Sequence, residues 1–384
     1  MTPKRILLVH LVANGDCLMA TTIARQIKYD YPGCHLTWAI SYKCRQVIDN
    51  NPDVDAVWEV VFAPNESPLG WDVWNRVKCE AEAKKAAGEF DLLFFTQVFP
   101  DNKCRFDGTT RSSTFRNYPT PITVPVSPVI QLREPEIKKV AGFVEQNQLL
   151  RFRNVILFEC APASGQSKLD QRKGIAIAQR LVEGRPDTVV IVSTHLPFRS
   201  PHSQIVDGSS LSFRENVELS HVCTLLVGCS SGITWLLTSE AAKKIPMVQF
   251  LNPQVLGASF ASVAYDFEYW GLPAEHILES RGGTVEEMIT IISAALDDFG
   301  FARKRYHEAF KPGFWDFLLF LEYHSFGQLL RIFETCALFR RRNRFGWSDY
   351  LDIGRLSRVL FVQVSLLYDG IQQLVRNRLK APSK

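Results

Sequence analysis

The stretch "LLVHLVANGDCLMATTIARQI", residues 7–27, decides the fold. Its first half is a continuous apolar run, which is typical of a parallel strand that is buried on both faces. The run stops at Asn14-Gly15-Asp16, and apolar residues then recur at helical spacing. The stretch therefore predicts a buried strand that turns sharply into a helix, with a carboxylate at the start of that helix.

The same alternation of strand and helix continues along the chain. In the first half, strands are expected at residues 5–12, 34–41, 54–61 and 91–98, and helices at 16–33, 42–52, 71–90 and 134–148. Residues 100–133 are rich in Pro, Arg, Ser and Thr, which predicts loops with one or two short strands.

The alternation restarts after residue 150. Strands are expected at residues 153–161, 187–195, 223–229 and 245–252, and helices at 174–184, 212–222, 232–244 and 284–300. This order predicts two doubly wound α/β domains, residues 1–150 and 151–300. Because ligands of such sheets bind beyond the carboxyl ends of the strands, two facing domains predict a cleft between them.

Charge and composition narrow the class of protein. The 384 residues are 46% hydrophobic and 22% charged, as in a globular protein, and a net charge of +4 gives no reason to expect a nucleic-acid partner. Nine cysteines without a C-x-x-C pair argue against a disulfide scaffold and a zinc site. Neither a signal peptide nor a membrane-spanning run of about 18 apolar residues is evident, so a cytoplasmic protein is expected.

The last part of the chain differs from the rest. Residues 301–384 contain 15 Lys and Arg against 7 Asp and Glu, so they carry +8 and residues 1–300 carry −4. Their aromatic and arginine-rich pattern predicts an amphipathic helical extension. Two interpretations stay open: the extension packs on the body, or Arg340, Arg341, Arg342 and Arg344 contact an anionic membrane surface.

Asp16 is the first candidate for chemistry. Gly15 would permit the strained φ of a sharp turn, and Asp16 would then lie at or near the helix N-cap. Its carboxylate either caps the free N–H groups or projects into the cleft as a general base. The helix dipole and the capping bonds would keep it ionised. Asn14 and Gly15, at the same corner, are expected to contact the acceptor, that is, the molecule whose hydroxyl group such a base would deprotonate.

Two segments of the second half are candidate phosphate sites. The first, "CAPASGQSKLDQRK" at residues 160–173, offers Ser164, Lys168 and backbone N–H groups, although an ordinary solvated loop is the alternative. The second, "VGCSSGITWL" at residues 227–236, opens a helix with Ser230, Ser231 and Gly232, although a purely structural turn is the alternative.

Other polar residues are expected at the same cleft. Glu159 and His195 lie at or just after the ends of predicted strands. There they would face the donor, that is, the phosphate-bearing substrate of the two candidate phosphate sites. The loop-rich part of the first half contributes candidates for gripping an anionic acceptor such as a phosphorylated glycolipid, unless they are simply solvated: Arg105, Arg111 and Arg116.

These segments resemble glycosyltransferase family 9, the heptosyltransferase family. Residues 5–60 are similar to its opening, with the strand, the G-D turn, the helix that ends in Y-P and the N-P-D-V-D run. "APASGQSK" resembles the family's P-G-A-S…K donor loop, and residues 219–253 resemble its later donor segment. The resemblance covers about residues 4–300.

The resemblance implies a GT-B fold, a nucleotide-activated sugar donor, inversion at the anomeric carbon and no metal or other cofactor. It implies that Asp16 is the base, that Lys168 and Ser164 meet the donor phosphates, and that Ser231 and Gly232 match the G-x-D-[ST]-G turn. Ser230 stands where that motif has an aspartate.

The sequence thus predicts a metal-independent inverting glycosyltransferase that acts on a cell-surface glycan or a lipopolysaccharide-like glycolipid. Two alternatives stay open. Ser230 favours a non-catalytic scaffold that binds sugar nucleotides at the membrane, and a GT-B fold is also compatible with a sugar-nucleotide epimerase.

Overall fold

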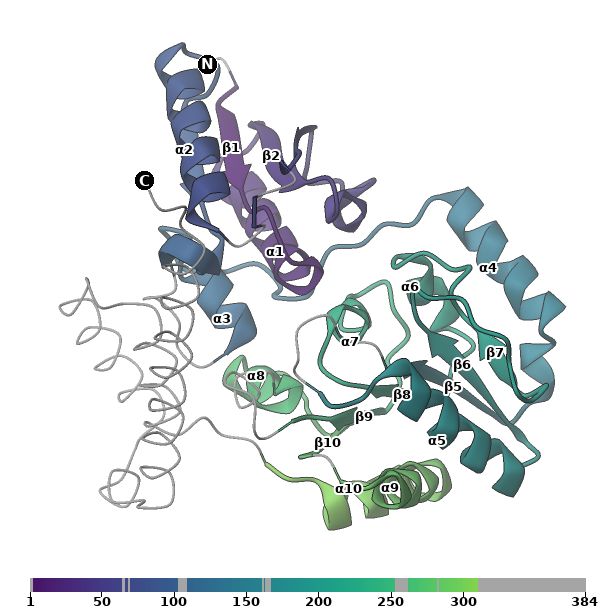
Figure 1. The fold of residues 1–384 in the computed structure, drawn as a ribbon. Helices are drawn as coiled ribbons and strands as arrows, with labels where there is room; N and C mark the ends of the chain where they lie inside the picture. The colour runs from purple at the N-terminus through teal and green to yellow at the C-terminus, as the bar shows by residue number, and fades with distance from the viewer. Residues whose placement is uncertain are drawn as a thin grey trace, which may run out of the picture. The chain divides into compact units, whose positions relative to one another are not determined.

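A computed structural model describes residues 3–63, 66–67, 70–102, 109–160, 162, 167–252, 262–281 and 283–309. The chain divides into two compact units, residues 1–310 and 311–384. The second unit lies outside the described residues, so the helical extension and its membrane contact stay predictions. The first unit contains two α/β lobes, each built on one parallel sheet (Figure 1).

The first lobe has a four-stranded sheet of order β3-β2-β1-β4. Its strands are β1 (Arg5–Val9), β2 (His35–Ser41), β3 (Ala56–Val60) and β4 (Leu92–Phe95), and its helices include α1 (Asn14–Asp30), η1 (Arg45–Ile48), α2 (Trp71–Ala86) and the π-helical turn η2 (Val98–Asn102). Four of the five β1 residues are fully buried, as the apolar run predicts for a strand covered on both faces.

The second lobe has a six-stranded sheet of order β10-β9-β8-β5-β6-β7. Its strands are β5 (Asn154–Glu159), β6 (Thr188–Ser193), β7 (Ile205–Asp207), β8 (Leu225–Gly228), β9 (Met247–Phe250) and β10 (Ile277–Ser280). Its helices are α5 (Gln171–Gly184), α6 (Glu215–Leu219), α7 (Gly232–Leu236), α8 (Val263–Tyr269), α9 (Val285–Asp297) and α10 (Phe299–Tyr306). Figure 1 shows α5, α9 and α10 on one face of the sheet, where a separate apolar cluster lies.

Several elements depart from the sequence-based expectations. The expected strands between residues 109 and 133 are wrong: the described residues there form the helix α3 (Thr110–Phe115) and loops. Helix α7 has five residues and ends well before residue 244. Just after it, the N–H and the hydroxyl of Thr238 both donate to the Trp235 carbonyl, at 3.1 and 2.6 Å, which is the pattern of a turn.

Helix α4 (Glu134–Gln146) and the short η4 (Leu149–Arg151) connect the two sheets along the chain. Arg214, at the N-cap of α6, fastens this connection and is only 3% exposed. Its guanidinium donates to Glu136 of α4 at 2.7 Å and to the carbonyls of Asp49 and Gln131 at 2.7 and 2.6 Å. One buried cation therefore joins the start of α6 to α4 and to the end of η1.

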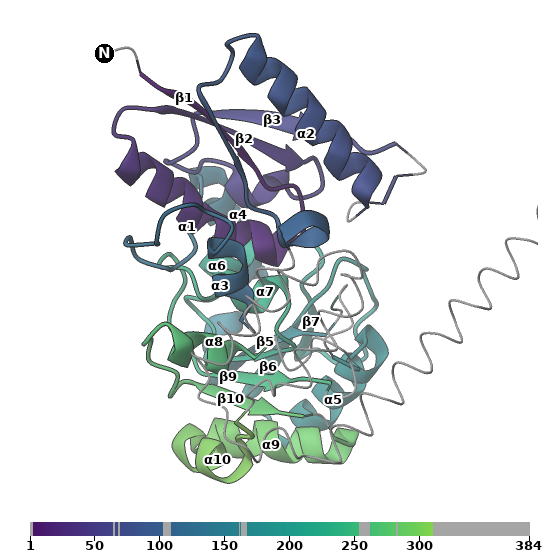
Figure 2. The ribbon, with the colours of Figure 1, turned by 90° about the vertical axis from the view of Figure 1, so that its left-hand side faces the viewer.

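The lobes also share a buried core. Helix α1 packs against α7, and α3 packs against α8, so that these four helices lie between the two sheets (Figures 1 and 2). One apolar cluster contains Leu18 of α1 together with Trp235 and Leu236 of α7.

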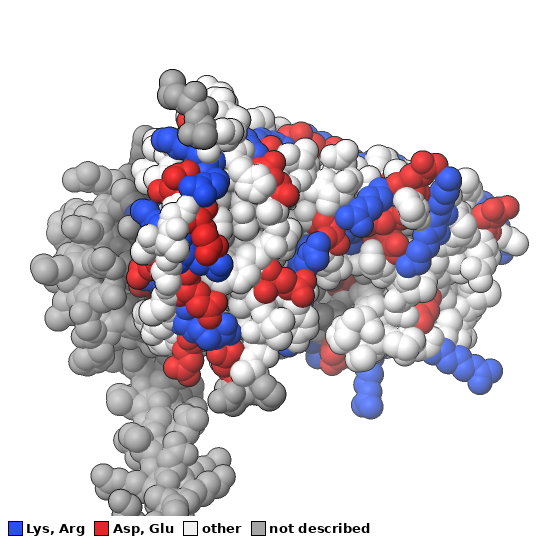
Figure 3. Space-filling model, turned by 90° about the horizontal axis from the view of Figure 1, so that it is seen from above, with Lys and Arg blue, Asp and Glu red and all other residues white. Residues whose placement is uncertain are grey.

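The charged side chains on the face shown in Figure 3 do not gather into a patch of one sign: basic and acidic side chains are interspersed there. Among the described residues, no helix is both long and apolar enough to cross a bilayer.

Candidate active site

Asp16 is the third residue of α1, and the N-cap is Ala13. The backbone N–H of Ala13 donates to the Asp16 carboxylate, but burial has the larger effect and raises the pKa of Asp16 to about 6. The helix start was expected to keep the group ionised, and burial narrows the pH range over which it does so. A carboxylate with a pKa near 6 is mostly ionised at neutral pH and still basic enough to accept a proton, which suits a general base.

The corner before Asp16 faces the second lobe. Gly15 lies inside α1 and has no positive φ, so the expected strain is wrong. A Cβ there would lie 3.6 Å from Cδ1 of Trp235, an ordinary contact distance, so this position lies against α7 of the second lobe. The side-chain oxygen of Asn14 is buried and has no hydrogen-bond partner among the described residues. The corner thus offers an unused acceptor beside Asp16.

The start of α7 meets this corner. A Cβ on Gly232 would lie 3.6 Å from Cβ of Asn14 and 2.9 Å from Cε2 of Phe213. The Ser231-Gly232 turn of the second lobe therefore lies against the turn that carries Asp16. The two candidate turns are therefore in contact, and a cleft between the lobes stays a prediction.

Glu159 has a different role from the expected one. It ends β5, is 3% exposed, and accepts hydrogen bonds from the Ile233 N–H at 3.0 Å, from the Thr234 hydroxyl at 2.8 Å and from the Ser231 hydroxyl. Its carboxylate therefore caps α7 and does not face a donor. The Ile233 N–H, at the start of α7, therefore has an anionic partner from the chain itself.

Ser230 has a backbone that is fixed by a hydrogen bond to a side chain of the neighbouring strand β9. It is fully buried and has a left-handed φ of 54°, and its N–H donates to Oε1 of Gln249 at 2.7 Å. Donor contacts through Ser230, Ser231 and Gly232 stay a prediction, because the hydrogen bonds at this turn fix its shape and do not identify a ligand.

Arg111 is also not where the sequence suggested. It lies in α3 and is 1% exposed, with Nε 3.3 Å from Oδ1 of Asp266, a residue of α8. Its guanidinium also lies over the Phe267 ring, 5.1 Å from the centroid. Arg111 therefore joins the lobes and is not available to an acceptor. Arg116 follows α3 and is half-buried, and Arg105 lies outside the described residues.

The remaining donor candidates are at the edge of the second sheet. Lys168 is exposed just before α5, His195 is exposed just after β6, and Ser164 lies outside the described residues. Their donor roles stay predictions. No group of three or more His, Cys, Asp or Glu side chains is arranged to hold a metal within the described ranges.

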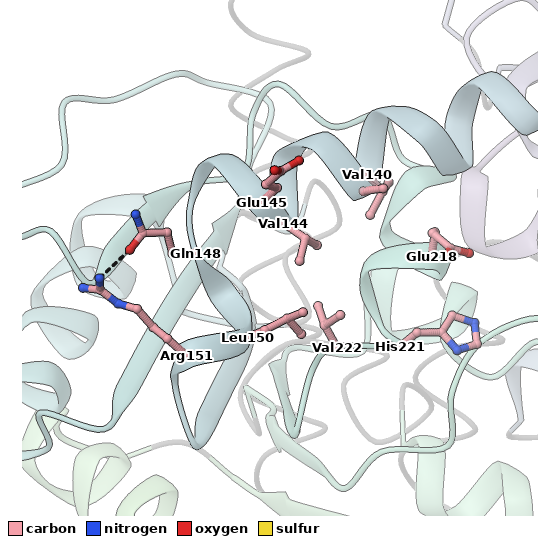
Figure 4. A pocket seen from close by; sticks show the side chains of 10 residues that line it. Val140, Val144, Glu145, Gln148, Leu150, Arg151, Glu218, His221 and Val222 are labelled. Atoms are coloured by element: carbon pink, nitrogen blue, oxygen red, sulfur yellow. Dashed lines mark hydrogen bonds between the residues drawn. The ribbon is translucent and has the colours of Figure 1, made fainter.

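A separate pocket lies near the connecting helix and contains none of the predicted site residues. Its volume is about 630 Å³, and its walls include Val140 and Val144 of α4, Leu150 of η4 and Val222 after α6 (Figure 4). Glu218 and His221 lie at its rim. It is therefore distinct from the region where the two turns meet.

The close packing at the two turns predicts opposite effects for two glycine substitutions. Gly232→Ala should destabilise the fold by about 1–3 kcal/mol, because the new Cβ would lie 2.9 Å from the Phe213 ring. Gly15→Ala should be neutral or stabilising, because its contact at 3.6 Å is an ordinary one and alanine favours a helix. Urea unfolding of both variants checks this, and equal stabilities would contradict the proposed packing.

Comparisons with known proteins find similarity in structure and not in sequence. No protein-family model matches the sequence, and no curated protein matches it. A glycosyl transferase family 9 structure from Veillonella parvula matches 77% of this chain and 93% of its own, with 17% identity and a TM-score of 0.51. ADP-heptose lps heptosyltransferase II from E. coli matches 77% of this chain and 99% of its own, with 14% identity and a TM-score of 0.48. A putative UDP-N-acetylglucosamine 2-epimerase from Listeria monocytogenes matches 81% and 92%, with 13% identity and a TM-score of 0.47.

The first of these matches confirms the fold that the resemblance implies. The chain has the two-lobed α/β architecture of GT-B proteins, and the resemblance to glycosyltransferase family 9 holds at the level of the fold.

Proposed function

We propose that this protein is an inverting, metal-independent glycosyltransferase. It moves a sugar from a nucleoside-diphosphate donor to a hydroxyl group of a glycan or a lipopolysaccharide-like glycolipid. The observation that carries the proposal is the meeting of the Asp16 turn with the Ser231-Gly232 turn between the two lobes. A membrane-embedded acceptor would bring the reaction to the inner face of the cytoplasmic membrane, as the basic extension at residues 301–384 suggests.

The proposed reaction is a single displacement. The Asp16 carboxylate removes the proton of the acceptor hydroxyl, and the oxygen attacks the anomeric carbon from the face opposite the nucleotide. The new glycosidic bond forms as the bond between carbon and phosphate oxygen breaks, which inverts the configuration. The leaving diphosphate takes the electron pair, and Lys168 stabilises its charge.

The pKa of Asp16 supports this assignment. At about 6, it places the proton-accepting form in the majority at neutral pH. The unpartnered side-chain oxygen of Asn14 supports it further, because that oxygen can accept a hydrogen bond from a second hydroxyl of a bound sugar.

Nucleotide binding tests the donor half of the proposal. ADP, UDP, GDP, CDP and dTDP are added separately, and the melting temperature is measured. At least one should raise it, because a ligand at 100 times its Kd stabilises the native state by about 2.7 kcal/mol. Lys168→Ala should reduce that shift, whereas Lys138→Ala, at an exposed ion pair of α4, should not.

Two results would count against the proposal. If none of the five nucleotides changes the melting temperature, the nucleotide-sugar donor is wrong. If the protein binds a nucleotide sugar and forms no product with glycolipid acceptors, the non-catalytic scaffold becomes the better explanation.

A further inference from the structure

Gln97 lies two residues after the end of β4, at the edge of the first sheet from which the chain enters α1 and Asp16. Pairing of β1 with β4 ends at Val9 and Phe95, and the His10 N–H still donates to the Ala39 carbonyl of β2 at 3.1 Å, but the N–H groups of Leu11 and Val12 donate to a side chain instead. Oε1 of Gln97 accepts two of them, from Leu11 at 2.7 Å and from Val12 at 3.1 Å. Gln97 is 1% exposed, so both bonds are shielded from water.

The side-chain nitrogen and the backbone carbonyl of Gln97 also form hydrogen bonds. Its Nε2 donates to the Phe99 carbonyl at 2.6 Å, which fixes which end of the amide faces the Leu11-Val12 turn. Nδ2 of Asn102 donates to the Gln97 carbonyl at 2.9 Å. The turn η2 thus anchors Gln97, and Gln97 anchors the backbone that follows β1.

This backbone leads directly to Asp16. Val12 precedes Ala13, whose N–H donates to the Asp16 carboxylate and whose carbonyl accepts the Cys17 N–H at 2.8 Å. The position of the Ala13 N–H therefore depends on Val12, and the position of Val12 depends on Gln97.

We propose that Gln97 is a positioning residue for the proposed transfer reaction: through Leu11 and Val12 it fixes the backbone at Ala13, the N-cap of the helix turn that carries Asp16. The inference rests on the proposed function for the role of Asp16. It adds a residue that does not touch the substrates and acts through the Ala13 N–H.

The second lobe provides a matched control. Gln249 of β9 is also fully buried, and its Oε1 also accepts a backbone N–H of a strand-to-helix turn, from Ser230 at 2.7 Å. Replacing either glutamine by methionine keeps the approximate size and removes the acceptor. Both replacements should reduce stability, but only the one at Gln97 should change Asp16.

Few titratable groups surround Asp16, which keeps its titration interpretable. On its own helix the next group is the Cys17 thiol, and the group beside Cys17 is the thiol of Cys44, the N-cap of η1. In the second lobe, the Glu159 carboxylate at the end of β5 is bonded to Ser231 and Ile233, at the turn that meets this corner. Burial and the Ala13 N–H, rather than a charged neighbour, set the pKa of Asp16.

The experiment measures the pKa of Asp16 directly. Carboxyl ¹³C chemical shifts are followed from pH 4 to pH 8 in the full chain, and Asp16→Asn identifies the Asp16 signal. Gln97→Met should raise the pKa of Asp16 by about 0.5–1, because the ionised form loses part of its hydrogen bond. Gln249→Met should leave it unchanged while lowering the melting temperature.

The same variants are then compared in the transfer assay, with the donor found by nucleotide binding. Gln97→Met should move the acidic limb of the kcat/KM profile upward by the same amount, and should lower kcat roughly tenfold with an unchanged donor KM. A purely structural glutamine would lower the melting temperature without moving the limb.

An unchanged Asp16 pKa in folded Gln97→Met overturns the inference. If that variant does not fold, Asn102→Leu, which removes the bond to the Gln97 carbonyl, should raise the pKa in the same direction, and an unchanged value there overturns the inference equally. Because the titration needs no substrate, a shifted pKa in a protein without transfer activity would refute the proposed function and leave the positioning intact.

Discussion

Asp16→Asn should lower kcat for sugar transfer about 1,000-fold, because an amide of the same shape cannot remove the proton of the acceptor hydroxyl. The nucleotide-induced rise in melting temperature should persist, since Asp16 belongs to the first lobe. Release of the nucleoside diphosphate and formation of glycosylated product measure the effect. Asp72→Asn, at the exposed start of α2, is the matched control and should keep full activity. A kcat for Asp16→Asn within threefold of the wild type would reject the base.

The same variant should be more stable than the wild type above pH 6. Burial raises the pKa of Asp16 from 3.8 to about 6, so the native state binds the proton more tightly than the unfolded chain does. Wild-type stability therefore falls as the pH rises from about 4 to about 6, and the loss is complete above that range. Asparagine cannot ionise, so Asp16→Asn should gain at most about 3 kcal/mol between pH 4 and pH 7. Urea unfolding at both pH values checks this.

Arg111→Met should destabilise the fold by about 3–5 kcal/mol, the largest effect on stability that we expect. The substitution leaves Asp266, which is 0% exposed, without the guanidinium that lies 3.3 Å away. Burial lowers the pKa of Arg111, and the charge of Asp266 opposes that shift. Equilibrium unfolding in urea is the measurement.

Two further variants isolate the buried charge. In Arg111→Met/Asp266→Asn neither side chain of this pair is charged, so part of the lost stability should return. Lys138→Met removes an ion pair with Glu134 in which both side chains are 74% exposed, and it should change stability by less than about 1 kcal/mol. If Arg111→Met is as mild as Lys138→Met, the ion pair does not hold the lobes together.

The comparison of sequence and structure shows which features periodicity can reveal. The buried run before Asn14 and the helix after it were predictable, because strand and helix periods are local properties of the sequence. Helix α3 was not predictable in this way. Its residues "TRSSTF" are polar and were expected in a loop, and they are helical because Arg111 finds Asp266 on a helix more than 150 residues away.

The candidate site could be predicted only in part, because local patterns locate its turns but do not show which residues contact each other. The two turns could be found from the residues that end buried strands, but the partner of each polar group depends on which strands are neighbours. Glu159 caps α7 because β5 lies beside β8. Gln97 was missed because residues 91–98 were interpreted as strand, whereas β4 ends at Phe95. A polar side chain at the end of an apolar run was the available signal.

The Arg214 bonds and the apolar cluster that contains both Leu18 and Trp235 make the two lobes thermodynamically interdependent. Opening one sheet to solvent would expose part of the interior of the other, so the lobes should unfold in one transition. A nucleotide that contacts only the second lobe would then slow amide hydrogen exchange in β1 and β2 as well, far from any atom it touches.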